Sequence, residues 1–160
     1  SLPGLTCDPM QPGVSCSFVQ NEAYGRPNGG EKAPRTGTLK RVRVIAGGPG
    51  AFKLQLVKSK DVGGVWKSRV KAIGPKITYT GQSADNWDMD NYKVESFRVN
   101  IPIKKGWRLA MKSRTTSAIR CSSGGDNTLI HTPPLVRRAP FTPATGDDGC
   151  WMLVEGVIKY

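Results

Sequence analysis

Hydrophobic and polar residues alternate most regularly in segment 37–58, GTLKRVRVIAGGPGAFKLQLVK. Val42 and Val44 alternate with Arg41 and Arg43, and every second residue from Phe52 to Leu56 is again apolar. A period of two places the apolar side chains on one face of a β-strand and the cations on the other. Gly-Gly-Pro-Gly interrupts the alternation, as a tight turn does. The pattern predicts a β-hairpin with one face in the core and one basic face in solvent.

Shorter alternating segments recur along the rest of the chain. We expect further strands at 16–20, 66–72, 77–80, 92–103, 107–112, 118–121, 128–131 and 150–160. Pro102 suggests a sheet edge or a strand end, and Gly156 suggests a bulge or a close approach of backbone. No segment shows helical periodicity, and 19 glycines and 12 prolines are distributed along the chain. The sequence predicts an all-β fold: a two-sheet antiparallel β-sandwich or jelly roll of about nine strands.

At 160 residues the chain is long enough for one domain with a two-layer core. We assign residues 1–15 to an irregular N-terminal arm and residues 16–160 to a single β-sandwich domain. The expected core residues are Val42, Val44, Phe52, Leu54, Leu56, Val99, Leu109 and Val154. The tryptophans expected in the core, because they are in phase with apolar neighbours, are Trp66, Trp107 and Trp151. No apolar run is long enough to cross a membrane.

Four cysteines, an even number, favour two disulfides formed in an oxidising compartment. Four cysteines allow three pairings, and proximity in sequence favours Cys7–Cys16 and Cys121–Cys150. None of them lies in a C-x-x-C pair, and His131 is the only histidine. A structural zinc site is therefore poorly supported, and we expect the disulfides to hold the fold together.

The formal net charge is +12, from 24 Lys and Arg against 12 Asp and Glu. Such an excess attracts nucleic acid, acidic polysaccharide or an anionic cell surface, but it also simply favours solubility. The cations opposite the apolar phase of their own strands are Arg41, Arg43, Lys53, Lys67, Arg69, Lys71, Arg108 and Lys112. The candidate binding residues are Trp87, Arg41, Arg43, Lys53, Lys67 and Arg69. Nucleic acid is disfavoured because no aromatic residues are interleaved with the cations, and a face that discourages aggregation would show the same pattern.

Segment 81–91, GQSADNWDMDN, reads as an acidic loop. Asp85, Asp88 and Asp90 offer hard oxygen ligands, which makes them weak calcium candidates, although their spacing differs from that of an EF-hand loop. An acidic turn in a basic protein is the simpler interpretation, and we expect no other cofactor. Trp87 is expected to be exposed, where its ring could stack on a sugar beside the carboxylates. A loop tryptophan can equally cover the core or insert into a neighbouring subunit.

Hydrolytic catalysis has little support in the sequence. His131 is at the end of a predicted strand, and Ser122, Ser123 and Asp126 are near it in sequence, but no nucleophile elbow is present. A structural or surface histidine is the better interpretation. We therefore predict a non-enzyme without catalytic residues.

A cysteine-flanked SCSFVQ strand is followed by GTLKRVRVIAGGPGAFKLQLVK, then by FRVNIPIKKGWRLAMK and a closing CWMLVEGVIKY. This order resembles a β-sandwich domain that is frequent in predicted secreted proteins of soil actinobacteria. In that family a G-T-V-x-x-V-x-V…F-x-L-x-V hairpin precedes an F-x-V-x-L-P-V-x-A-G-D-x-I-G-L segment. Here Lys-Lys replaces the usual small residue, and Trp107 follows Gly106. The resemblance covers residues 16–160 and implies the fold and an extracellular location, but no site residues.

The expected location is secreted, extracellular or at the cell surface, and a start at Ser1 fits a mature product whose leader has been removed. The first hypothesis is a structural protein that self-associates through its N-terminal arm and strand edges, so that its partners are copies of itself. The apolar arm residues that favour it are Leu2, Leu5, Met10 and Val14. The alternative, favoured by Trp87 and its aspartates, is a carbohydrate- or polyanion-binding module for an anionic or neutral polysaccharide. A secreted hydrolase is a distant third.

Overall fold

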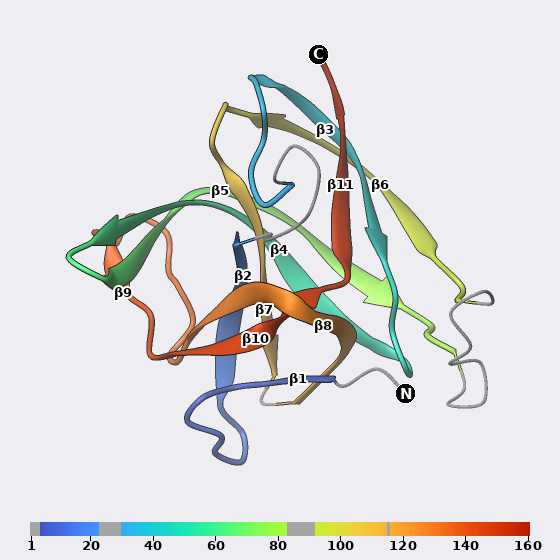
Figure 1. Ribbon diagram of the computed structural model, residues 1–160. Coiled ribbons are helices and arrows are strands. Elements are labelled where there is room, and N and C mark those ends of the chain that lie inside the picture. Colours follow the sequence, from blue (N-terminus) through green and yellow to red (C-terminus); the bar gives the residue numbers. More distant parts are fainter. Residues whose placement is uncertain (1–3, 23–29, 83–91, 115) are drawn as a thin grey trace.

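The computed structural model of the chain describes residues 4–22, 30–82, 92–114 and 116–160. Every regular element in these residues is a β-strand, which confirms the predicted all-β class (Figure 1). The strands are β1 (Gly4–Thr6), β2 (Ser15–Glu22), β3 (Gly37–Val44), β4 (Gly50–Val62), β5 (Val65–Tyr79), β6 (Glu95–Ile103), β7 (Arg108–Arg114), β8 (Thr116–His131), β9 (Thr142–Pro143), β10 (Gly146–Met152) and β11 (Val154–Lys159). The described residues contain no helix with the length and apolarity needed to cross a membrane.

The strands form two antiparallel sheets. The larger sheet has the order β1-β8-β2-β7-β4-β5-β9, with β10 also paired to β8, and the smaller sheet has the order β11-β3-β6. Figure 1 shows β3, β6 and β11 gathered on one side of the molecule. Two pairs of predicted strands are each one long strand: 66–72 and 77–80 belong to β5, and 118–121 and 128–131 belong to β8. Described strands therefore number eleven rather than about nine.

The main core contains apolar residues from both sheets. β3 contributes Leu39, Val42 and Val44, and β4 contributes Leu54 and Leu56, all of them fully buried. The predicted core residues that are buried are Val42, Val44, Phe52, Leu54, Leu56, Leu109 and Val154, whereas Val99 is half-buried and packs against this core. Among the predicted core tryptophans, Trp151 is buried and Trp66 and Trp107 are half-buried.

A second, smaller cluster lies on the other face of the larger sheet. Its buried residues are Val19, Val57, Val70, Ala110, Leu129 and Leu135. Leu135 comes from segment 132–145, which connects β8 to β10, so this segment covers part of that face. The larger sheet is consequently buried on one face and only partly covered on the other.

The predicted hairpin in segment 37–58 is wrong. β3 pairs with β6 and β11, whereas β4 pairs with β5 and β7, so the two strands belong to different sheets. The apolar phase of each strand is as predicted, but both apolar faces meet across the core. The tight hairpin is β4–β5, where Gly63 and Gly64 have φ of 62° and 88° between the paired residues Val62 and Val65. Two successive residues with positive φ are what a two-residue hairpin turn of type I′ requires.

A closed ring of backbone hydrogen bonds joins three segments where the chain passes between the sheets. The Ile45 N–H donates to the Leu153 carbonyl (3.1 Å), the Leu153 N–H to the Arg120 carbonyl (2.9 Å), and the Arg120 N–H to the Ile45 carbonyl (3.0 Å). Ile45 follows β3, Leu153 separates β10 from β11, and Arg120 belongs to β8. The predicted closing strand 150–160 is therefore two strands, β10 in the larger sheet and β11 in the smaller one.

Both expected disulfides are present. The Cys7–Cys16 bond has an S–S distance of 2.08 Å and joins the segment after β1 to β2. The Cys121–Cys150 bond has an S–S distance of 2.00 Å and joins β8 to β10. The predicted edge position of Pro102 is also confirmed, because β6 is the outer strand of the smaller sheet. Gly156 approaches Leu39 closely, since a Cβ there would lie 2.8 Å from the Leu39 Cδ1.

We predict that Leu54→Ala lowers the free energy of unfolding by about 2–5 kcal/mol, because it removes a fully buried side chain from the main core. Val62→Ala at the exposed tip of the β4–β5 hairpin is the control, and should change it by less than about 0.5 kcal/mol. Urea unfolding of both variants measures the difference. Equal effects would show that the inner face of β4 is misassigned.

Gly81→Ala should destabilise the protein by more than about 1 kcal/mol, because Gly81 has φ of 72° and an added Cβ would overlap the Gly48 backbone. Gly48→Ala is the matched control, since an added Cβ at Gly48 meets nothing within 4 Å. Thermal melts measure the melting temperatures of the two variants, and that of Gly81→Ala should be the lower. A Gly81→Ala protein as stable as Gly48→Ala would contradict the close approach.

Candidate functional site

Three lysines form a row across the larger sheet. Lys53 of β4 is directly opposite Lys76 of β5 on one side and Lys112 of β7 on the other, and all three side chains are exposed. Because neighbouring strands lie about 4.8 Å apart, the three ammonium groups start from evenly spaced positions on one line. Like charges directly opposite each other destabilise a strand pair. Stability of the sheet therefore does not explain the row.

A groove opens beside this row because β4 and β7 separate there. Lys53–Lys112 is the last β4–β7 pair: Ser113 and Arg114 pair with β2, while Ala51 pairs with β5. The groove has a volume of about 1200 Å³. Its basic lining residues are Lys53, Lys76, Lys112, Arg114, Arg120 and Arg137, and none of the described lining residues is acidic. We refer to it as the cationic groove.

Two aromatic residues close the inner side of the cationic groove. Phe52 and Tyr79 line it but are almost completely buried, with ring centroids 6.1 Å apart. Burial raises the pKa of Tyr79, and hydrogen bonds to Ser117 and Ala118 only partly oppose this shift. The phenol therefore stays neutral at physiological pH and adds no negative charge to the groove. Neither ring presents an open face to a ligand.

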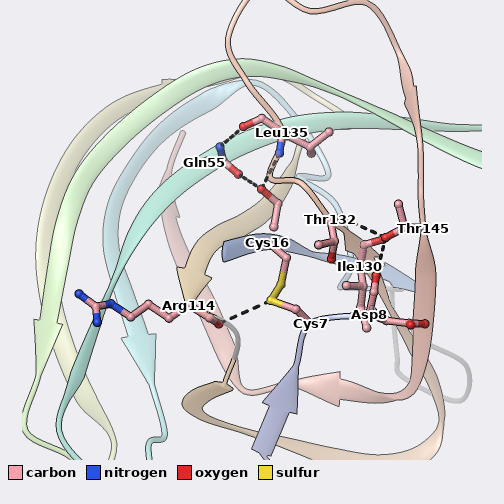
Figure 2. Close-up of a disulfide and its surroundings, with 10 residues drawn as sticks. Cys7, Asp8, Cys16, Gln55, Arg114, Ile130, Thr132, Leu135 and Thr145 are labelled. Carbon is pink, nitrogen blue, oxygen red and sulfur yellow. Dashed lines mark hydrogen bonds between the residues drawn. A yellow bond between two sulfur atoms is a disulfide. The ribbon is translucent and has the colours of Figure 1, made fainter. Parts of the chain in front are cut away.

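A ring of hydrogen bonds positions the outer rim of the groove. The Ser17 hydroxyl donates to Gln55 Oε1 (2.8 Å), Gln55 Nε2 donates to the Leu135 carbonyl (3.0 Å), and the Leu135 N–H donates to Ser17 Oγ (2.9 Å). Figure 2 shows Gln55 and Leu135 facing each other in this arrangement. All three residues are buried, so each buried polar group of this ring has a partner. The ring fixes the chain just before Val136 and Arg137, which form the rim.

The N-terminal disulfide lies next to the β7 wall of the groove. The Sγ of Cys7 is 3.6 Å from the Arg114 carbonyl oxygen, while the Arg114 side chain extends away from the disulfide (Figure 2). The Thr145 hydroxyl accepts a hydrogen bond from the Thr132 N–H (2.9 Å) and donates one to the Asp8 carbonyl (2.7 Å). These contacts attach the N-terminal segment to β7 and to segment 132–145.

The predicted N-terminal arm contains a strand that belongs to the larger sheet. β1 pairs with β8, and Leu5 is fully buried in the main core, although we expected it to offer an apolar surface to a partner. Val14 is half-buried, and Met10 is 64% exposed. Leu2 lies outside the described residues. Most of the described apolar surface of the arm is thus used within the domain.

The predicted binding residues do not form one surface. Lys53 lines the cationic groove, while Lys67 and Arg69 lie nearer the hairpin end of β5. Arg41 and Arg43 are on β3 in the smaller sheet. The sequence pattern placed each of these cations opposite the apolar phase of its own strand, but it did not show which strands are neighbours.

Two of the predicted solvent-facing cations have partners. Arg43 Nη1 lies 2.8 Å from Glu155 Oε1 in an exposed ion pair. Arg108 is only 6% exposed, so its predicted place on a solvent face is wrong. It donates hydrogen bonds to the backbone and side-chain oxygens of Asn21, and its guanidinium carbon is 5.3 Å from the ring centroid of Trp66. The second apolar cluster covers this part of the sheet, which is why Arg108 is buried.

Trp87 and the calcium candidates Asp85, Asp88 and Asp90 lie outside the described residues, so their roles stay predictions. Among the described residues, metal-ligating atoms of Cys121, Asp148 and Cys150 lie within 4.8 Å of one another. Both sulfur atoms are in a disulfide, so they are not the thiolates that zinc binds.

The sequence pattern does not single out several groove residues. It predicts Lys112 on a basic face but not as a binding residue. It gives no binding role to four further cations that line the groove, namely Lys76, Arg114, Arg120 and Arg137. Alternation around Lys76 could have placed it on a solvent face, but no sequence signal specifies its pairing opposite Lys53.

A smaller cleft of about 380 Å³ has a different chemistry. Its lining includes the aromatic residues Trp107, Trp151 and Tyr160 and the carboxylates Glu31 and Glu155. Aromatic rings beside carboxylates suit a neutral sugar, because rings stack on C–H groups and carboxylates accept hydrogen bonds from hydroxyls.

Comparisons with protein-family models, with curated proteins and with solved structures found no match to this chain. Its class therefore follows from its own architecture: an all-β, antiparallel, disulfide-bonded protein with a cationic groove on the larger sheet.

His131 is buried at the end of β8. Burial lowers its pKa to about 4, and the Pro143 backbone only partly opposes this shift. The folded pKa is thus below the unfolded value of about 6.5. Between these pH values the unfolded chain binds more protons than the folded protein. The contribution of His131 to the free energy of unfolding is therefore complete above about pH 6.5 and decreases as the pH falls towards 4. We predict that the free energy of unfolding decreases by up to about 3 kcal/mol because of this residue.

Urea unfolding between pH 7 and pH 4 measures this loss, and His131→Gln is the comparison because it keeps a polar side chain without the titration. The variant should show a flatter dependence of unfolding free energy on pH over this window, whatever its stability at pH 7. Parallel curves for the two proteins would show that His131 is not buried in its neutral form.

Proposed function

We propose that the protein is a secreted, non-enzymatic β-sandwich module that binds acidic polymers in the cationic groove. The observation that carries this proposal is the basic lining, three lysines in a row and three arginines, around a concave surface without an acidic lining residue among those described. A cleft lined by charges of one sign concentrates the field and attracts ligands of the opposite sign. A polymer that neutralises several of these charges also releases condensed counterions, which favours binding at low salt.

Solubility alone is a weaker explanation of this lining. A charged surface that serves solubility works best with both signs interspersed. The groove instead combines like charges at directly opposite strand positions, which costs stability in the absence of a ligand. A bound polyanion removes that repulsion.

The groove suits recognition of charge rather than of bases. Proteins that bind single-stranded nucleic acid combine cations with exposed aromatic rings, on which bases stack. The aromatic residues in the described lining, Phe52 and Tyr79, are buried in the core. Acidic polysaccharides present the required charge without demanding stacking platforms.

Other features support the architecture and location in this proposal. A main core with residues from both sheets agrees with a β-sandwich. Two disulfides agree with an oxidising, extracellular environment. The burial of His131 supports a non-enzymatic role, since a buried ring does not reach a substrate.

Two other functions have narrower support. Self-association through the arm loses the apolar surface of Leu5, which is buried within the domain, but the exposed Met10 and the strand edges remain for such an interface. Neutral-sugar binding is favoured by the aromatic cleft, and Trp107→Ala would test it with a neutral oligosaccharide.

Heparin should bind the protein at low salt. The logarithm of the binding constant should fall linearly with the logarithm of the salt concentration. Lys53→Gln should weaken binding and reduce the salt slope by about 1, because it removes the central charge of the row. Lys104→Gln is the matched control: it removes the same charge from an exposed position between β6 and β7, outside the groove. Isothermal titration calorimetry at several salt concentrations measures both quantities.

Equal losses in the two variants would mean that net charge, and not the groove, attracts heparin. Absence of heparin binding at low salt, together with concentration-dependent association in sedimentation velocity, would replace this proposal with self-association.

A further inference from the structure

The lysine row has the spacing of a polymer with one charge per sugar. The row consists of Lys76, Lys53 and Lys112, which are directly opposite one another on three neighbouring strands. The backbone positions of neighbouring lysines are therefore about 4.8 Å apart across the sheet. This spacing is close to the length of one pyranose residue in a 1,4-linked chain. Successive acidic groups of such a chain are rotated about the chain axis, and the long, flexible lysine stems reach groups on either side of a chain that lies across β5, β4 and β7.

Two exposed aliphatic side chains line the same groove as the lysine row. Ile73 of β5 is opposite Gln55, on the same face as Lys53, and it is 40% exposed. Val136 at the rim is 60% exposed. Both residues line the cationic groove. Sugar rings present C–H groups that can pack on such side chains, whereas inorganic polyphosphate has no apolar surface to bury.

The residue type of the row is also informative. An arginine fork binds carboxylate or phosphate through two parallel hydrogen bonds and fixes its geometry, whereas a lysine is a compact charge on a flexible stem. A row of lysines thus suits single acidic groups that repeat at a regular distance on a chain, with Arg114 and Arg137 available beyond the row.

We infer, on the basis of the proposed function, that the ligand class is a polyuronate, an acidic polysaccharide with one carboxylate per sugar. Three successive carboxylates contact Lys76, Lys53 and Lys112, and the sugar rings pack against Ile73. The interaction is reversible and involves no covalent step.

Titration calorimetry with oligogalacturonates of increasing length tests this inference. The tetramer should bind at least about fivefold more tightly than the dimer, because only the longer chain reaches all three lysines. Fully methyl-esterified oligogalacturonate, which keeps the sugars and lacks the charges, should not bind. Inorganic polyphosphate is the control for charge without sugar.

Ile73→Ser should weaken tetramer binding at least about threefold and leave polyphosphate binding unchanged, because only the sugar contacts this side chain. Val62→Ser, which changes an exposed aliphatic residue at the hairpin tip, should leave both unchanged. Circular dichroism melts verify that each variant is folded as the parent protein is.

Equal affinities for dimer and tetramer, or an Ile73→Ser variant that binds the tetramer normally, would overturn the polyuronate assignment. If heparin still bound through Lys53 in that case, the proposed function would stand. If neither heparin nor oligogalacturonate bound at low salt, both proposals would fall.

Discussion

Three backbone hydrogen bonds among Ile45, Arg120 and Leu153 hold the two sheets in their relative positions. Two of the passages of the chain from one sheet to the other, after β3 and between β10 and β11, meet β8 at this point. Buried backbone groups need partners, and a closed ring of three segments supplies one donor and one acceptor to each. The ladders of β3 with β6 and β11, and of β4 with β5 and β7, keep these two consecutive strands in separate sheets, and the junction lies where the chain leaves β3. The same junction holds Arg120 at the lining of the cationic groove.

On the outer face of the larger sheet, a cation is buried or exposed according to whether other side chains cover it. Arg108 and Lys112 lie on the same strand and on the same face, yet Arg108 is buried and Lys112 is exposed. Arg108 lies beside Trp66, whose ring packs against the second apolar cluster, and its guanidinium is used in hydrogen bonds to the β2 backbone and to Asn21. The ring of Ser17, Gln55 and Leu135 attaches segment 132–145 to this face. The groove contains the cations of β4, β5 and β7 that this segment leaves uncovered.

An arrangement of like charges has a stability cost that the rest of the domain offsets. The core and two disulfides stabilise the fold, so the sheet tolerates lysines at directly opposite positions. Salt screens exposed charges over about 10 Å, and a bound polyanion neutralises them directly. The surface is therefore most stable when negative charge is close to it, which links the electrostatics of the apo protein to the ligand class we propose.

The sequence by itself predicted most of the strand segments and their apolar phase, and it favoured the cysteine pairing that is present. These features are local: a period of two assigns Val42 and Leu54 to buried faces wherever their strands are placed, and Cys7 is near Cys16 in the chain. Only the tertiary structure decided that β3 and β4 face each other instead of pairing, and that Lys53 lies between Lys76 and Lys112. Strand partners and register depend on which faces are buried together, and residues distant in sequence supply those faces. For that reason the core was largely predictable, whereas the groove, built from three strands and two connecting segments, was not.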